Sequence, residues 1–233
     1  MRLAMLSVVV LTLAGCALGE RPASDPLRRN IGWYAIAGGE DLRATCTAGA
    51  PARYRFVYNA IWEEQVRLYE VTASAPGMAS AATIRSTVIR GAPRILQTYV
   101  FGGGSDSSET RLEPEAFRSL AGALDAAGFA RPPADGLRLQ SFDFYWLVTA
   151  CVDGVWALNA WRRDDPAFAS LGFDRLLFAA DATGVRVNPP RRVDPAQRLL
   201  DYGESPSERG RARASAFELV VRGGRLWGVP RFL

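Results

Sequence analysis

The chain has 233 residues, which is enough for one sizeable domain around a single core. Its net charge is +4, and all 28 basic residues are arginine, because the sequence contains neither lysine nor histidine. This composition excludes Ser-His-Asp and Cys-His catalysis, histidine-containing zinc sites, Schiff-base lysines and the P-loop lysine. Acidic residues are interleaved with the arginines, so we expect no nucleic-acid partner, and no motif indicates a cofactor.

The first sixteen residues have the pattern of an export signal. Met1-Arg2 provides a minimal basic start, and the apolar run from Leu3 to Ala14 is too short to span a bilayer. The run ends in Leu13-Ala14-Gly15-Cys16, which resembles the lipobox of bacterial lipoproteins residue for residue. The resemblance implies lipid transfer to the Cys16 thiol, cleavage before Cys16 and acylation of its amino group. An ordinary secretory signal with a chance cysteine is the alternative.

The lipobox resemblance divides the chain into a signal peptide (1–15), a lipidated start and tether (16–30) and one domain (31–233), in which 190–213 is predicted to be flexible. The implied partner is the lipid bilayer, bound through acylated Cys16, because several acyl chains anchor a protein stably. Ala17 is not the aspartate that favours inner-membrane retention in enterobacterial lipoproteins. The outer membrane, facing the periplasm, is therefore expected in a Gram-negative host. No later apolar run approaches the roughly 20 residues of a spanning helix, which predicts a soluble body.

Two further cysteines, Cys46 and Cys151, remain if Cys16 carries lipid. An even number of cysteines in an oxidising compartment favours a disulfide between them. Two separate buried thiols are the alternative. A disulfide requires the two Cα atoms to lie within roughly 7 Å of each other.

Alternating apolar and polar residues predict strands in the first half of the domain. We expect these strands over 54–59, 65–73, 83–90 and 95–101. The segment from Gly102 to Glu109 is predicted to be a flexible hairpin end. A calcium loop using Asp106 and Glu109 is the alternative, but the segment lacks the alternating acidic spacing of such loops.

Two helices are predicted in the second half of the domain. The first runs from Pro114 to Ala127, with apolar residues at helical spacing and Gly128 as its C-terminal cap. The second has Asp165 as its N-cap and ends at Gly184. Its buried stripe is predicted to contain Phe173, Leu176, Leu177 and Ala180.

A hairpin is predicted between these helices. Asp153-Gly154 is typical of a two-residue type I′ turn, which would connect strands over 142–151 and 155–161. The resulting register places Trp146 opposite Trp161 on one face. Both faces of the hairpin are rather apolar, which predicts a central position in the sheet.

A late hairpin is expected over 217–222 and 225–229, around Gly223-Gly224. Runs of strands with only two helices indicate an α+β fold: an antiparallel β-sheet of about six to eight strands with two α-helices packed on one face. The turn over 150–154 and the helix segment 173–177 loosely resemble small proteobacterial envelope proteins of unassigned function. That resemblance implies no catalytic residues.

Two sets of residues are candidate functional sites. Trp146 and Trp161 share one face of the hairpin and are the candidate binding surface for an envelope protein or glycan, with core packing as the alternative. Glu63-Glu64 and Asp164-Asp165 are candidate acids of a glycan hydrolase, which needs two carboxyl groups roughly 5–10 Å apart. A polar loop and a helix cap are the simpler interpretations of these pairs.

The hydrolase hypothesis makes a geometric demand. At least two of five carboxylates must face each other across one cleft: Glu63, Glu64, Asp143, Asp164 and Asp165. Because the usual catalytic groups are absent, the sequence favours a noncatalytic envelope lipoprotein with a binding or structural role. The carboxylate-dependent hydrolase acting on cell-envelope glycans is the alternative.

Overall fold

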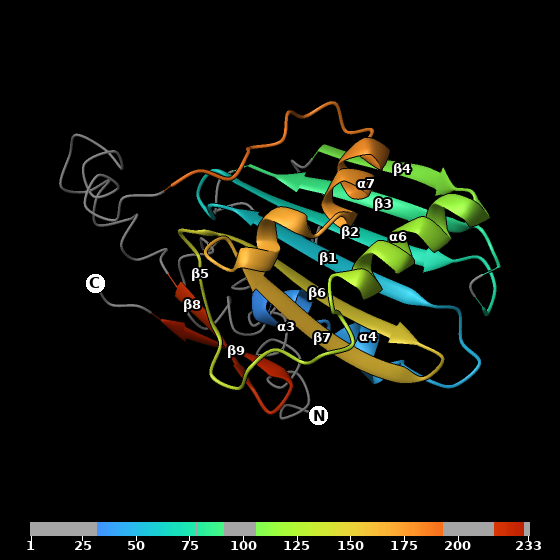
Figure 1. Cartoon of the computed structure of the whole chain (residues 1–233), viewed down its shortest axis with the longest axis horizontal. Helices are drawn as coiled ribbons and strands as arrows, with labels where there is room; N and C mark the ends of the chain where they lie inside the picture. The colour runs from blue at the N-terminus through green and yellow to red at the C-terminus, as the bar shows by residue number, and fades with distance from the viewer. Residues whose placement is uncertain (1–31, 78, 91–105, 193–216, 231–233) are drawn as a thin grey trace, which may run out of the picture.

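The computed structural model describes residues 32–77, 79–90, 106–192 and 217–230 (Figure 1). The predicted signal peptide, Cys16 and the tether lie outside these residues. So do the predicted strand over 95–101 and most of the segment 190–213 that was expected to be flexible. Among the described helices, none combines the length and apolarity needed to cross a bilayer.

A six-stranded antiparallel sheet forms the centre of the domain, in the order β4-β3-β2-β1-β6-β7 (Figure 1). The strands are β1 (Arg53–Ala60), β2 (Gln65–Ala73), β3 (Ala82–Ile89), β4 (Asp106–Leu112), β6 (Phe144–Val152) and β7 (Val155–Arg162). The strands predicted over 54–59, 65–73 and 83–90 and the hairpin of β6 and β7 are therefore confirmed. Burial explains their apolar character, because β1 and β6 lie inside the sheet and both of their faces are covered.

The β6–β7 hairpin has the predicted turn and register. Asp153 and Gly154 have φ angles of 50° and 75°, as a type I′ turn requires, and Trp146 pairs with Trp161. The predicted central position is correct for β6 but wrong for β7, which is the last strand of the sheet. The second half of β7 is buried by other elements, whereas Val155 at its start is 68% exposed. Within the described sheet, β7 pairs only with β6.

Strand β4 corrects the prediction for residues 102–109. Its described part pairs with β3 along Asp106–Leu112, so 106–109 belong to a strand and do not form a flexible hairpin end. The sequence of this strand is polar because it lies at the sheet edge, with much of it facing solvent. No group of three or more acidic or cysteine side chains in the described residues is arranged to hold a metal ion.

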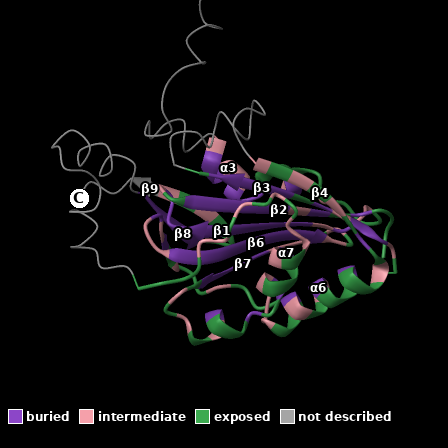
Figure 2. Ribbon diagram, turned by 90° about the horizontal axis from the view of Figure 1, so that it is seen from above, coloured by how far each residue is buried: buried purple, intermediate pink, exposed green. Residues whose placement is uncertain are grey.

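Helices cover one face of the large sheet, as predicted (Figures 1 and 2). Helix α6 (Pro114–Ala126) begins at a proline and buries Phe117, Leu120 and Leu124 against the sheet. Gly128, directly beyond its end, has a φ of 82°, which suits the predicted C-terminal cap. The outer side of α6 is exposed, and the strands beneath it are buried (Figure 2).

The second predicted helix is divided into two pieces. Asp165 caps the chain as expected, but a 3-10 helix, η3 (Pro166–Ser170), follows it, and α7 (Phe173–Ala180) begins only after Gly172. Phe173 and Leu177 are buried, as predicted. Leu176 is 39% exposed, and α7 ends before Asp181 and not at Gly184, so these two expectations are wrong.

A second layer covers part of the opposite face. It contains the three-stranded sheet β5-β8-β9, formed by β5 (Arg138–Gln140), β8 (Phe217–Arg222) and β9 (Arg225–Pro230). The short helix α3 (Tyr34–Ala37) lies on the same side and shares its apolar core, and α4 (Glu40–Ala44) follows it and contacts β6. The late hairpin is thus confirmed, although its strands belong to a separate small sheet. The α+β fold class is confirmed as well.

The predicted disulfide is present between Cys46 and Cys151. Their Cα atoms are 5.5 Å apart although the residues are separated by 105 positions in the chain. The bond joins the segment after α4 to β6, and therefore attaches the N-terminal helices to the large sheet.

Candidate functional site

The tryptophan pair proposed as a binding surface is in the core. Trp146 is 1% exposed and Trp161 is 4% exposed, and the ring of Phe173 from α7 packs on both. Tyr58 stacks on Trp146 from the neighbouring strand. These side chains are closed off by the helix layer, so the binding-surface interpretation is wrong for both residues.

Each of the two candidate acidic pairs contains a residue that makes structural contacts, Glu64 in the first and Asp165 in the second. The Glu64 carboxylate accepts hydrogen bonds from Arg191 at 2.6 Å and from the Asn188 amide at 2.7 Å, which links it to the segment after α7. Asp165 accepts from the backbone N–H of Ala167 at 2.8 Å and serves as an N-cap. Both groups therefore have structural partners.

Asp143 and Asp164 are the two acids that share a hollow, which has a volume of about 110 Å3. Each already has an arginine partner: Arg163 donates to Asp143 at 2.9 Å, and Arg162 donates to Asp164 at 3.2 Å. The hollow is small, and these ion pairs leave little reason for either carboxyl group to act as an acid. The geometry thus offers the hydrolase hypothesis no pair of acids facing each other across a deep cleft among the described residues.

A charged groove of about 270 Å3 lies on the other side of the large sheet, beside α4. The buried Arg55 pairs with Asp41 and with Glu70, each at 2.7 Å. Burial raises the pKa of Asp41, but the hydrogen bonds and the charge of Arg55 outweigh it and hold the pKa below its ordinary value. The charges at the centre of this groove therefore attach α4 to the sheet.

A third polar cluster attaches the segment after α7 to the helix-covered face. The guanidinium of Arg67 in β2 is paired with Asp181 and donates to the carbonyl of Val185 at 2.6 Å. The Tyr69 hydroxyl donates to the same carboxylate at 3.0 Å, and burial raises the pKa of Tyr69, so it remains neutral. This cluster has a complete set of partners and a structural role.

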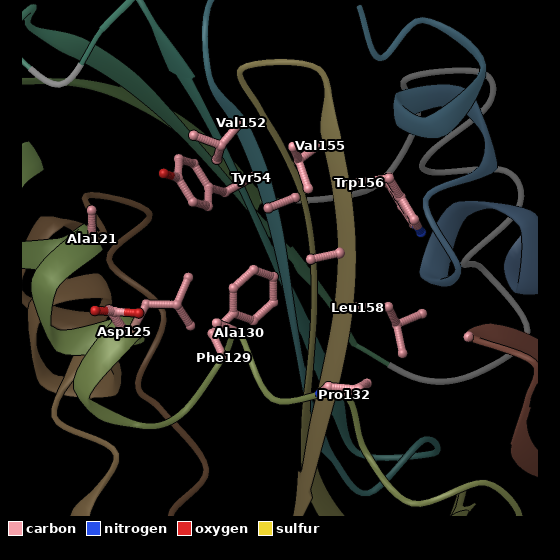
Figure 3. A pocket seen from close by; sticks show the side chains of 14 residues that line it. Tyr54, Ala121, Asp125, Phe129, Ala130, Pro132, Val152, Val155, Trp156 and Leu158 are labelled. Atoms are coloured by element: carbon pink, nitrogen blue, oxygen red, sulfur yellow. The ribbon is translucent and has the colours of Figure 1, made fainter.

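One pocket is apolar and has a volume of about 580 Å3. It lies where the end of α6 and the loop after it face the open edge of the β6–β7 hairpin (Figure 3). Among its described lining residues, Asp125 alone carries a charge, and burial raises the pKa of Tyr54, which therefore stays neutral. The other lining residues are Ala121, Leu124, Phe129, Ala130, Pro132, Ala150, Val152, Val155, Trp156, Ala157, Leu158 and Gly224.

This pocket is the best candidate for a functional site, because a concave apolar surface with few polar groups is typical of ligand sites. Sequence reasoning missed it, since its walls come from four separate segments of the chain. One signal was present: the apolar Phe129 and Ala130 directly follow the cap of α6, where a polar loop is usual. Only the structure identifies Val155, which is 68% exposed at the start of an otherwise apolar strand.

Comparisons with protein-family models, with curated proteins and with solved structures found no match to this chain.

Proposed function

We propose that the protein is a lipoprotein of a bacterial envelope, anchored through acylated Cys16 and carrying a domain that binds a partner without catalysis. The segment Leu13-Ala14-Gly15-Cys16 after a short apolar run is the observation that carries the anchor. The outer membrane, with the domain in the periplasm, is the location that Ala17 favours.

The pairing of the cysteines supports this assignment. The sequence has three cysteines, and Cys46 and Cys151 are joined, so Cys16 is the cysteine left for lipid. A disulfide also fits an exported domain, because periplasmic proteins meet oxidising conditions whereas cytosolic thiols are kept reduced.

The pocket beside α6 supports a binding role. Its apolar walls suit an apolar side chain or a similar group of a partner. In contrast, the acids that a hydrolase would need have arginine, amide or backbone partners elsewhere on the surface.

Metabolic labelling tests the anchor. Cells producing the tagged full-length chain with a labelled palmitate analogue should yield labelled protein that sediments with membranes. Cys16→Ala should lose the label completely, because its thioether-linked lipid cannot form. The matched control is the Cys46→Ala/Cys151→Ala double variant, which should keep the label. An unlabelled wild-type chain, or a labelled Cys16→Ala chain, would contradict the proposal.

A further inference from the structure

We propose that the open edge of β7 binds an extended peptide, which adds a strand to the large sheet and places an apolar side chain in the 580 Å3 pocket. This inference rests on the binding role proposed above and names the class of partner.

The hydrogen bonds of β7 identify which of its backbone groups point outward. The N–H of Arg163, directly beyond the end of β7, donates to the carbonyl of Phe144 in β6 at 3.0 Å. The backbone N–H and C=O groups of the odd-numbered residues of β7 therefore point toward β6. In an antiparallel pair, alternate residues point to the neighbouring strand and away from it. The N–H and C=O groups of Trp156, Leu158 and Ala160 therefore point away from the sheet.

One of these outward groups is satisfied within the chain. The N–H of Ala160 donates to the side-chain oxygen of Asn159 at 2.8 Å. Within the described part of the chain, no hydrogen bond joins the outward groups of Trp156 and Leu158 to another residue. Two donors and two acceptors thus lie in a row at the spacing of a strand, and both residues line the pocket.

The apolar pocket runs along this same edge. Four consecutive residues, 155–158, line it, although their side chains alternate between the two faces of the sheet. Figure 3 shows Trp156 and Leu158 on one side of the strand, with Tyr54 and Phe129 on the other. A pocket that contacts both sets of side chains must lie against the backbone edge between them.

The ends of the pocket limit what can enter it. The Asn159 amide donates to the carbonyls of Gly128 at 3.0 Å and Arg131 at 2.6 Å, so the loop after α6 crosses the strand there. At the other end, a Cβ on Gly154 would lie 2.5 Å from the backbone nitrogen of Ala48, so the turn is covered. These limits leave residues 155–158 between them, roughly 13 Å of strand, which suits one short extended segment better than the long edge of a second folded copy.

The chemistry of the partner follows from these groups. An acyl chain would fill the pocket but would leave the Trp156 and Leu158 backbone groups unpaired, whereas a peptide strand pairs them. The peptide residue that faces Leu124 and Phe129 is apolar. The exposed carboxylate of Asp125 at the rim attracts a basic residue beside it.

The test uses a displayed library of random linear peptides as the probe and the disulfide-bonded chain beginning at residue 17 as the target. Ala121→Arg places a long charged side chain in the pocket from α6. Ser119→Arg is its matched control, because it adds the same residue to an exposed position of α6 outside the pocket. Amide exchange followed by NMR reports which backbone groups of β7 become paired.

We expect the selected peptides to share an apolar residue at alternate positions. Their affinity should fall about tenfold or more in Ala121→Arg and stay unchanged in Ser119→Arg. Bound peptide should slow the exchange of the Trp156 and Leu158 amides about tenfold and leave that of Ala157 unchanged. Replacing alternate peptide amides by N-methyl amides should abolish these effects, because the pairing donors are lost.

Three outcomes would overturn the proposal. The first is a selection that yields no peptide with this pattern; the second is binding that leaves both amides exchanging at their free rates. The third is slowing of the same exchange with protein concentration alone, which would assign the edge to a second copy. A neutral apolar fluorophore distinguishes the two proposals. If it binds the wild type but not Ala121→Arg, and no peptide binds the wild type, then the peptide proposal is wrong and the pocket is still a binding site. Palmitate labelling at Cys16 is read independently of all these results.

Discussion

Arg67 in β2 and Asp181 directly after α7 form a buried ion pair. The side chain of Arg67 is 1% exposed and that of Asp181 is 3% exposed. A buried charge is tolerated only when it is fully partnered. The carboxylate here also accepts from Tyr69 at 3.0 Å and from the backbone N–H of Thr183 at 2.9 Å. Burial raises the pKa of Asp181, but the bonds from Thr183 and Tyr69 and the charge of Arg67 outweigh it, so the pKa is lowered.

Asp181→Asn should lower the free energy of unfolding at pH 7 by about 3 kcal/mol, because Arg67 loses its charged partner. The pKa of Asp181 is lower in the folded chain than in the unfolded chain, so its contribution is present above the ordinary value of 3.8 and disappears as the pH falls through the folded pKa. The variant should therefore lose less stability than the wild type on acidification from about pH 5 to 2. Urea unfolding at several pH values measures this difference.

Asp125→Asn is the control for this prediction, since Asp125 is exposed and lies at a pocket rim. Its free energy of unfolding at pH 7 should stay within about 0.5 kcal/mol of the wild-type value, because the substitution is on the surface. Parallel profiles for Asp181→Asn and the wild type would show that the pair does not couple stability to pH.

At the scale of elements, one glycine accounts for the division of the second predicted helix. Gly172 has φ and ψ angles of 73° and −42°, a combination that side chains with a Cβ strongly disfavour. It reorients the chain between η3 and α7, so that Phe173 and Leu177 point into the core while Leu176 is partly exposed. Helical periodicity in the sequence continues through this break, which is why it predicted one continuous helix.

Gly172→Ala should destabilise the protein by about 2 kcal/mol through backbone strain. Space is not the cause, because the nearest atom to the added Cβ is that of Ala123 at 3.9 Å. Gly122→Ala in α6 is the matched control and should stabilise the protein by about 0.5–1 kcal/mol, since alanine is the better helix former. Thermal unfolding measures the change in stability of both variants. Equal shifts of the melting temperature in the two variants would contradict the backbone strain at residue 172.

At the scale of the whole molecule, the disulfide connects the two layers. Cys46 follows α4 on one side of the large sheet, and Cys151 lies in β6 within it. Arg55 and Asp41 join the same helix to the sheet at 2.7 Å. The N-terminal helices, and with them the point where a tether from Cys16 would enter, are thus attached to the core by both covalent and ionic contacts.

The Cys46→Ala/Cys151→Ala variant should lose about 4 kcal/mol of unfolding free energy, because the bond closes a loop of 105 residues and restricts the unfolded chain. Guanidinium unfolding with and without reductant measures the loss. Reductant should bring the wild type to the stability of the double variant and leave the double variant unchanged. A wild type indifferent to reductant would show that the bond does not form in solution.

The candidate site was less accessible to sequence reasoning than the fold. The turn and the strand periodicity correctly predicted that Trp146 and Trp161 share one face of the hairpin. Strand periodicity contains no information about which element covers that face. The helix layer covers it, with Phe173 packed on both rings. The pocket beside α6 depends on the relative position of Tyr54, Leu124 and Ala157, which come from three segments that meet only in the folded chain.

Local chemistry allowed the sequence alone to determine the long helix from Pro114, the Asp153-Gly154 turn, the register of the β6–β7 hairpin and the α+β class. Each depends on residues close together in the chain, where dihedral preferences and side-chain periodicity act directly. The sequence also suggested the disulfide by counting cysteines. Only the tertiary structure decided that β7 is an edge, that polar residues 106–112 form a strand and that a second small sheet exists. These features depend on contacts between distant segments, and burial and strand pairing override local pattern there.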